Sequence, residues 1–320
     1  MWGKGDTPRV SVCIPTYNGE EFVAEAVRSV LAQELQDFEL LVVDDHSTDA
    51  TLEVVRALLD PRIRVYPNNE RLGIPGNWNR CLALARGEFF CLFHQDDVML
   101  PENLIRKAHV LASDPTVGLV HSTAEIVVEN SAPTSPADWI ENSLEDFTVD
   151  GRSYFRKLLF HGNRICAPTV VARRQALLDL SGFDEDLGFT PDYEMWMKMC
   201  VKSRVAFLSQ PLVRYRWHGT NASHAYRFER GVEEYLIAGR RALEYYLKWT
   251  KRQEEGEIFA EGLVALSSLR RWAVELERAK AWLEEQRLYW RAESERQVAT
   301  IAELRGCIAE LEKGMARPEV

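Results

Sequence analysis

Two adjacent carboxylates at the end of an apolar run are the first candidates for chemistry. The run 89–93 is apolar throughout, three of its five residues are aromatic, and Asp96 and Asp97 follow it closely. Such a run predicts a strand buried on both faces inside a parallel sheet. Ligands of open α/β sheets bind at the carboxyl ends of the strands, where this pair would lie. Neighbouring carboxylates repel each other, so they favour a Mg²⁺ or Mn²⁺ ion that carries substrate phosphates; capping of the helix that starts near Pro101 is the alternative.

Polar residues also follow the earlier strands. The β-rich run 10–14 is followed by Pro15 and Tyr17, and the apolar run 38–43 ends at a second carboxylate pair that includes Asp45. Helical patterns separate these runs, and the alternation predicts an α/β fold with a mostly parallel sheet flanked by helices. A structural alternative exists for each residue, because Asp45 could cap a helix and Tyr17 could pack on the sheet.

The rest of the first 225 residues keeps this alternation less regularly. Strands are expected at 63–66, 117–121 and 169–172, a strand pair at 205–208 and 212–216, and loops at 67–77 and 130–138. Asp192 stands close to the start of an apolar helix, and His218 follows the last strand.

The composition excludes several classes of protein. Of the 320 residues, 46% are hydrophobic and 28% are charged, as in soluble globular proteins. The net charge of −10 argues against nucleic acid as a partner. No run of 18 apolar residues and no signal-peptide pattern occurs, so we expect a cytoplasmic protein whose scattered cysteines are buried thiols. Neither a dinucleotide-binding nor a Walker-type glycine motif is present.

The chain from about residue 226 predicts helix alone, with no proline until Pro318. Large apolar residues occupy six of seven positions at heptad spacing, which are Leu269, Leu276, Leu283, Trp290, Gln297, Leu304 and Leu311. This spacing predicts an all-α, coiled-coil-like extension. Homo-oligomer formation through these helices and packing within one chain are both open.

The segment 226–252 interleaves aromatic and basic residues. One interpretation is peripheral association with a membrane surface, at the inner face of which a lipid-linked acceptor would lie. We favour the other, in which the aromatic stripe packs on the preceding domain while the charges face water.

Six short motifs occur in a fixed order along the chain. They are Val-Ser-Val-Cys-Ile-Pro-Thr-Tyr-Asn-Gly at 10–19, Val-Val-Asp-Asp-His-Ser-Thr-Asp at 42–49, Ala-Arg-Gly-Glu at 85–88, Gln-Asp-Asp at 95–97, Ser-Gly-Phe-Asp-Glu at 181–185 and Pro-Asp-Tyr-Glu-Met-Trp at 191–196. In this order they make residues 8–220 closely resemble the inverting family 2 glycosyltransferases of the GT-A fold.

The resemblance implies a nucleotide-diphosphate sugar as donor, UDP- or dTDP-linked, and a glycan, lipid-linked or protein acceptor in bacterial surface polysaccharide or glycoconjugate synthesis. By similarity, Pro15 and Tyr17 border the base, and Asp45 accepts a hydrogen bond from the uracil or thymine imide. Asp96 would contact the ribose or a metal-bound water, and Asp97 would ligate the Mn²⁺ or Mg²⁺ ion that neutralises the departing diphosphate.

The second half of the site is implied in the same way, with some departures. Asp192 matches the family's catalytic base, but the flanking acidic residues differ, and Glu194 is a rival base. An Asp that is common two residues before the metal-binding pair is His94 here, so its role is open. His218 lies in a segment that resembles one whose His approaches the diphosphate or metal, and a structural role is its alternative.

The resemblance divides the chain into a nucleotide-sugar-binding half at 1–97, an acceptor-binding and catalytic half at 98–225 and a helical extension at 226–320. Two other functions are weighed. A non-catalytic scaffold acting through its helical arm would not need the three carboxylates Asp45, Asp97 and Asp192. A sugar-phosphate nucleotidyltransferase would need a cationic glycine-rich loop near the start, and the segment 15–19 carries no cation.

Overall fold

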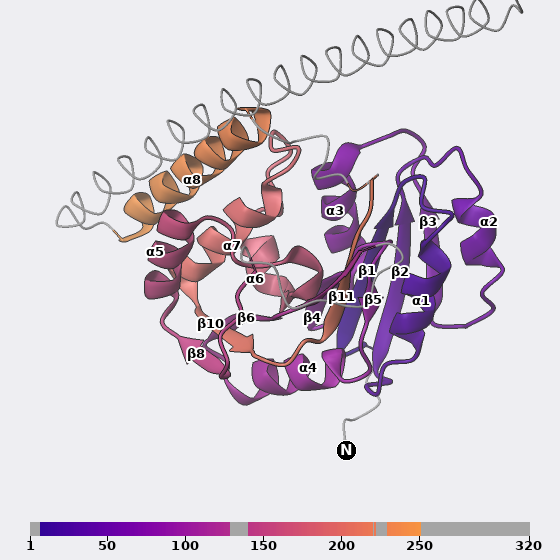
Figure 1. Ribbon diagram of the computed structural model, residues 1–320, viewed down its shortest axis with the longest axis horizontal. Helices are drawn as coiled ribbons and strands as arrows, with labels where there is room; N and C mark the ends of the chain where they lie inside the picture. The colour runs from indigo at the N-terminus through magenta and orange to yellow at the C-terminus, as the bar shows by residue number, and fades with distance from the viewer. Residues whose placement is uncertain (1–6, 129–139, 220, 222–228, 251–320) are drawn as a thin grey trace, which may run out of the picture. The chain divides into compact units, whose positions relative to one another are not determined.

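A central sheet of eight strands runs through the described part of the chain (Figure 1). The computed structural model describes residues 7–128, 140–219, 221 and 229–250. Neighbouring strands follow the order β3-β2-β1-β4-β9-β6-β10-β8. The strands are β1 (Val10–Thr16), β2 (Phe38–Asp44), β3 (Ile63–Pro67), β4 (Phe89–Leu92), β6 (Val117–Ser122), β8 (Phe147–Val149), β9 (Val171–Arg173) and β10 (Arg204–Leu208). Only β8 and β9 run antiparallel to their neighbours, so the predicted mostly parallel sheet is confirmed.

Helices cover both faces of this sheet because its central strands are apolar on both faces. Along β4, Phe89 and Cys91 belong to one core cluster, and Phe90 and Leu92 belong to the other. The helices are α1 (Val23–Leu31), α2 (Thr51–Arg56), α3 (Gly73–Leu84), α4 (Asn103–Ser113), α5 (Gly151–His161), α6 (Arg174–Asp179), α7 (Pro191–Lys202) and α8 (Glu229–Thr250), with a 3-10 turn η1 at Ala167–Thr169. Helices α1, α2 and α4 pack on the first cluster, and α3, α5, α6, α7 and α8 pack on the second.

A second sheet of three strands lies next to the carboxylate pair. It consists of β5 (Val98–Met99), β11 (Val213–Trp217) and β7 (Glu125–Val128), in that order. The expected strand pair 205–208 and 212–216 is therefore wrong, because β10 pairs with β6 and β8 in the large sheet. The chain leaves that sheet at Leu212, whose carbonyl accepts the amide of Leu100 at 3.0 Å and directs β11 onto β5.

Helix α3 begins inside the segment 67–77 that was expected to be a loop. Gly73 has a φ of +76°, a left-handed conformation that glycine adopts without strain. The side chain of Asp45 accepts the amides of Leu72 and Gly73, and Pro75 lies in the first turn, where a missing N–H costs nothing. The helix is started by a carboxylate that is remote in sequence.

Helix α8 packs aromatic side chains on the preceding domain, which confirms the favoured interpretation for the described part of the extension. Tyr246 is buried and stacks on Phe155, with ring centroids 4.8 Å apart, whereas Trp249 is exposed. The heptad positions from 269 onward and the expected loop at 130–138 lie outside the described residues.

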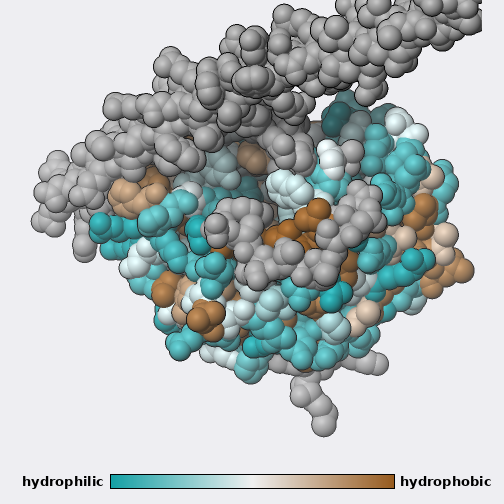
Figure 2. Space-filling model, in the orientation of Figure 1, coloured by the Kyte–Doolittle hydropathy of each residue, from teal (hydrophilic) through white to brown (hydrophobic). Residues whose placement is uncertain are grey.

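The visible face of the described residues is mainly hydrophilic, with hydrophobic side chains in small separate areas (Figure 2). Among the described residues, no helix combines the length and the apolar character needed to cross a membrane.

Candidate active site

The carboxyl ends of β1, β2 and β4 meet at one edge of the sheet. The parallel register pairs Thr16 with Asp44, and the Thr16 hydroxyl donates to the Asp44 carboxylate at 2.9 Å. The amide of Asp45 donates to the carbonyl of Thr16 at 2.7 Å, and the amide of Phe93 donates to the carbonyl of Cys13 at 2.8 Å. The polar residues that follow three separate strands are thus gathered at one place, as the sequence predicted.

Asp45 is 3% exposed and binds the segment that leads into α3. Its Oδ1 accepts the side-chain amide of Asn68 at 3.0 Å and the backbone amide of Leu72 at 2.7 Å, and its Oδ2 accepts the amide of Gly73 at 2.9 Å. Within the described part of the chain, Oδ2 has this one donor and keeps capacity for another. Asp45 therefore caps a helix, which was the structural alternative for this residue. Recognition of a base imide by Asp45 stays a prediction.

Tyr17 and Pro15 lie half-buried at the end of β1. Gln95 fixes the backbone of Tyr17 by accepting its amide at 3.0 Å and donating to its carbonyl at 3.1 Å. The guanidinium of Arg71 lies over the Tyr17 ring, 3.9 Å from its centroid, within cation–π range. An aromatic ring and a cation are thus held together at this edge, and sequence reasoning did not select Arg71.

One arginine holds the turn that carries the carboxylate pair. The backbone amide of Arg216 donates to Oδ1 of Asp97 at 2.8 Å, and its Nε donates to the carbonyl of Asp96 at 2.9 Å. Its guanidinium also pairs with Glu25 of α1 at 2.6 Å. Arg216 and Asp97 are 119 residues apart, so no local spacing could have revealed this contact.

The donor atoms around Asp97 fit a divalent cation. His94, Asp96 and Asp97 each offer a ligand atom within 4.8 Å of the others. Asp97 is 1% exposed, its Oδ2 has no hydrogen-bond partner within the described residues, and Nδ1 of His94 lies 3.7 Å away. Burial, followed by the charge of Asp96, raises the pKa of Asp97 well above its usual value. Carboxylate oxygens with an adjacent imidazole suit Mn²⁺ or Mg²⁺, and a bound cation would relieve this unpaired buried oxygen.

His218 approaches the other carboxylate of the pair. Its Nε2 lies 3.0 Å from Oδ2 of Asp96, an oxygen that also accepts the side-chain amide of Asn221 at 3.2 Å. Burial opposes ionisation of Asp96, but the hydrogen bond with His218 and the nearby imidazoles outweigh it and lower the pKa of Asp96. The Asp96 side chain is 17% exposed and that of Asp97 is fully buried, so Asp96 forms the solvent side of this group. Ligation of a metal by His218 stays a prediction.

Asp192 lies half-buried in the first turn of α7. The side-chain amide of Asn163 donates to its Oδ2 at 2.8 Å. Burial raises the pKa of Asp192 to about 6, although hydrogen bonds from Tyr193 and Asn163 oppose the shift. A carboxylate with such a pKa is ionised at neutral pH and still basic enough to accept a proton. Asn163 was missed because it lies 29 residues away in a segment without a periodic pattern.

The rival base Glu194 points into the interior. Glu194 is fully buried and forms an ion pair with Lys198, one helical turn later on α7. Burial raises its pKa, and the contact with Lys198 opposes that shift. Two residues along a helix turn the side chain by about 200°, so Glu194 does not share the face of Asp192.

Cys166 is a buried thiol, 3% exposed. Burial raises its pKa well above the usual value, and the charges of Asp97, Asp192 and Asp96 also raise it.

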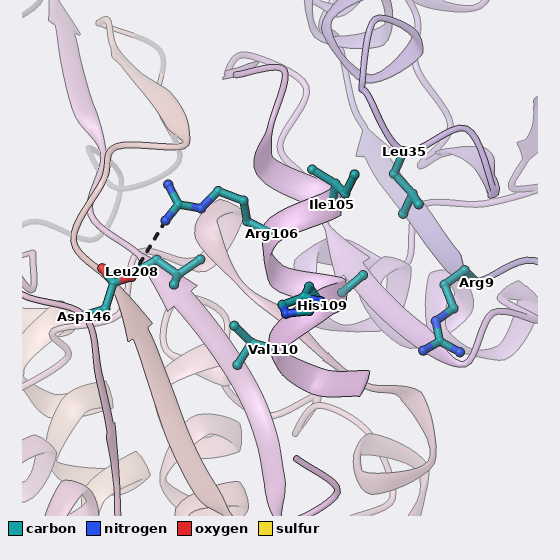
Figure 3. Close-up of a pocket in the computed structure, with 9 residues that line it drawn as sticks. Arg9, Leu35, Ile105, Arg106, His109, Val110, Asp146 and Leu208 are labelled. Atoms are coloured by element: carbon teal, nitrogen blue, oxygen red, sulfur yellow. Dashed lines mark ion pairs between the residues drawn. The ribbon is translucent and has the colours of Figure 1, made fainter. Parts of the chain in front are cut away.

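A cavity of about 570 Å³ beside α4 is a different hollow (Figure 3). Its floor is mostly apolar, and Arg106 on its rim pairs with Asp146 at 3.7 Å. None of the predicted site residues lines it. Its size does not make it the active site, because it lacks converging acid–base or metal-binding groups.

The sequence model of glycosyl transferase family 2 matches residues 11–180, more than half of the chain. The chain belongs to this family. It is a glycosyltransferase with the GT-A fold, as the motifs predicted. An uncharacterised protein of Mycobacterium tuberculosis is 32% identical over 235 residues, which cover 70% of this chain and 72% of that protein. An uncharacterised glycosyltransferase of Haemophilus influenzae is 26% identical over 248 residues, 75% of either chain.

Solved structures of other glycosyltransferases share the fold. Staphylococcus aureus TarS 1–349 in complex with UDP-GlcNAc superposes with a TM-score of 0.61 at 23% identity, over 75% of this chain and 66% of that one. A mannosyltransferase from Pyrobaculum calidifontis in complex with GDP-Man and Mn²⁺ gives 0.50 at 19% identity, over 84% of each chain. The family 2 match ends at residue 180, before α7 and α8, so the setting of Asp192 is seen in the structure alone.

Proposed function

We propose that this family 2 glycosyltransferase transfers a sugar from a nucleotide-diphosphate donor, UDP- or dTDP-linked, to an acceptor hydroxyl in one displacement with inversion. The observation that carries the proposal is the setting of Asp192, a half-buried carboxylate in the first turn of α7 whose Oδ2 accepts the side-chain amide of Asn163 at 2.8 Å. A single displacement needs one base on the face opposite the leaving group and no carboxylate nucleophile. The acceptor would be a glycan, a lipid-linked saccharide or a protein in bacterial surface glycoconjugate synthesis.

Asp192 accepts the proton of the attacking hydroxyl in this mechanism. Its pKa of about 6, raised by burial, leaves it ionised at pH 7. Asn163 holds Oδ2 at 2.8 Å and so fixes the direction of the carboxylate. A positioned base contributes about 10²- to 10⁴-fold to the rate. The ion pair between the buried Glu194 and Lys198 supports Asp192 over Glu194 as the base.

The departing diphosphate is bound beside the carboxylate pair. Asp96, Asp97, His94 and His218 are the residues that would hold Mn²⁺ or Mg²⁺ there. When bound, the ion supplies positive charge that offsets the charge developing on the diphosphate. Arg216 fixes both carboxylate residues in advance, so the turn needs no reorganisation when the donor binds.

The nucleoside would bind at the end of β1. Tyr17 offers a ring under the guanidinium of Arg71, and Oδ2 of Asp45 keeps acceptor capacity for an imide N–H. The imide N–H of uracil or thymine would donate to that acceptor, and the preference for these bases comes from the family resemblance. The TarS and mannosyltransferase complexes, with UDP-GlcNAc and with GDP-Man and Mn²⁺, support a nucleotide-diphosphate sugar and a divalent ion in general.

We also retain the division of the chain into a donor half at 1–97, an acceptor half at 98–225 and a helical extension at 226–320. The turn after β4 ends the first half, and Asn163 and Asp192 belong to the second. Cytoplasmic location, self-association through the extension and peripheral membrane association remain predictions of the sequence.

A thermal-shift screen tests this function directly. UDP-GlcNAc, dTDP-glucose and GDP-mannose are compared with and without Mn²⁺; a ligand at 100 times its Kd stabilises the folded state by about 2.7 kcal/mol. We expect the UDP or dTDP sugar to raise the Tm only with Mn²⁺, and Asp97→Ala to abolish the effect of the ion. The matched control is Glu53→Ala, an exposed carboxylate on α2.

The outcomes separate the parts of the proposal. A response to GDP-mannose alone would contradict the role of Asp45, and no response to any sugar nucleotide would contradict the function. Binding without any release of nucleoside diphosphate would support the scaffold alternative. For a donor that is turned over, proton NMR of the product gives the anomeric configuration, and retention of configuration would rule out the single displacement.

A further inference from the structure

Helix α8 lies beyond the family 2 match, yet it packs on the helix that carries the catalytic base. The match ends at residue 180, and α8 begins at Glu229. It packs along α7 and joins the core cluster on that face of the sheet through Ala238, Ala242 and Tyr246. The sequence alone explains these positions as the apolar stripe of a docked helix. Tyr235 lies on the same helix, and packing on the core does not fully account for its position.

Three polar contacts tie α8 to the segment just before the base. Arg241 pairs with Asp184 and, at 3.1 Å, with Asp186. The carboxylate of Glu234 accepts the backbone amide of Phe189 at 2.7 Å. The segment 184–189 leads into α7 and Asp192. These contacts therefore hold it against α8.

Tyr235 contacts two aromatic residues that flank Asp192 in the sequence, Phe189 and Tyr193. Its ring centroid lies 5.2 Å from that of Tyr193, the residue after the base, and 6.0 Å from that of Phe189 in an edge-to-face arrangement. Tyr235 and Phe189 are both half-buried, so each keeps part of its surface open. Burial raises the pKa of Tyr235, and the charge of Asp192 raises it further.

We propose that Tyr235, with Phe189, forms the acceptor wall of the site and stacks on the pyranose ring whose hydroxyl Asp192 deprotonates. The C–H groups on one face of a pyranose carry partial positive charge, and the face of an aromatic ring is negative, so the two attract. The inference rests on the proposed function and narrows it, because it selects a saccharide acceptor over an acyclic polyol or a protein hydroxyl.

The test measures acceptor binding directly, with saturation-transfer NMR on the full chain. The probes are the methyl glycosides of glucose, galactose, mannose and N-acetylglucosamine, with sorbitol and glycerol 3-phosphate as acyclic comparisons. The variants are Tyr235→Ala, Tyr235→Leu, which keeps an apolar side chain without an aromatic face, and Tyr235→Phe, which keeps the ring. Ile237→Ala, an exposed position on the same helix, is the matched control.

We expect at least one methyl pyranoside to bind to the unaltered protein, with the strongest saturation on the protons of one ring face. Tyr235→Ala and Tyr235→Leu should each raise its Kd by about three- to tenfold, since an aromatic contact adds about 0.5–1.5 kcal/mol beyond its buried area. Tyr235→Phe and Ile237→Ala should stay within about twofold.

Three results would overturn the inference: no pyranoside binds, an acyclic polyol binds as well, or Tyr235→Leu binds like the unaltered protein. The last would show that Tyr235 only packs. The thermal shift with sugar nucleotides distinguishes this failure from that of the proposed function. A response there, without dependence of pyranoside binding on Tyr235, would contradict the acceptor wall alone.

Discussion

Replacing Asp192 by asparagine should remove transfer and, at neutral pH, stabilise the fold. Burial raises the pKa of Asp192 from 3.8 to about 6. At about 1.4 kcal/mol for each pH unit, the ionised side chain costs the folded state about 3 kcal/mol. Asp192→Asn keeps the shape, and its new carbonyl can still accept the hydrogen bond from Asn163, but it carries no charge. The variant should therefore lose about 10²- to 10⁴-fold in rate and gain stability.

The gain in stability should depend on pH with a definite sign. Between about pH 4 and pH 6 the folded state binds a proton that the unfolded chain has already released. The free energy of unfolding of the unaltered protein therefore falls, relative to that of Asp192→Asn, as pH rises through this window. Above pH 6 the difference is constant at about 3 kcal/mol, and at pH 4 it nearly vanishes.

Urea denaturation at pH 4.5 and pH 8 measures this difference, with the exposed Glu233→Gln as control. The rate of transfer should fall about tenfold for each pH unit below 6. A variant less stable than the unaltered protein at pH 8, or a difference of the same size at both pH values, would refute the role of burial. An acidic limb centred near pH 4 would refute the assigned pKa.

Three other perturbations follow from neighbouring contacts. Asn163→Ala removes a hydrogen bond that lowers the pKa of Asp192, so the acidic limb of the pH–rate profile should move to higher pH; an unmoved limb would leave Asn163 a structural residue. Glu194→Gln leaves the amine of Lys198 without its carboxylate and should cost about 1–3 kcal/mol in urea denaturation, with kcat changed by less than about threefold; a fall in kcat like that of Asp192→Asn would instead make Glu194 the base. Burial lowers the pKa of Lys107 to about 7, so the folded state holds fewer protons than the unfolded chain between about pH 7 and 10.5. Lys107→Met should therefore be more stable than the unaltered protein at pH 7, and the gap should narrow toward pH 10; a gap independent of pH would contradict the assigned shift.

The sequence was sufficient to place the residues at the ends of β1, β2 and β4. Each of these strands is mainly apolar and is followed by polar residues, and parallel pairing brings such ends to one edge. Asp45, Asp96 and Asp97 were located for this reason. The same logic placed Asp192, because a polar residue before an apolar helical pattern marks the start of a helix.

Local sequence patterns could not predict the contacts between segments that lie far apart in the chain. The start of α3 depends on Asp45, which lies 27 and 28 residues before the amides it caps. The partners of β11 are β5 and β7, and neither is its neighbour in sequence. Arg216, Asn163 and Arg71 act through such pairings, so their chemistry was invisible until the chain was folded.

The site is held together at a cost in stability, and this cost is an argument for a ligand. Asp97 is buried with one carboxylate oxygen that has no partner among the described residues, next to a second carboxylate. Asp192 is ionised at neutral pH in surroundings that favour its neutral form. A protein selected for stability alone would replace such groups by apolar residues. In the proposed mechanism a cation would relieve the buried Asp97 where the diphosphate departs. A proton from the acceptor hydroxyl would neutralise the half-buried Asp192 where the acceptor attacks.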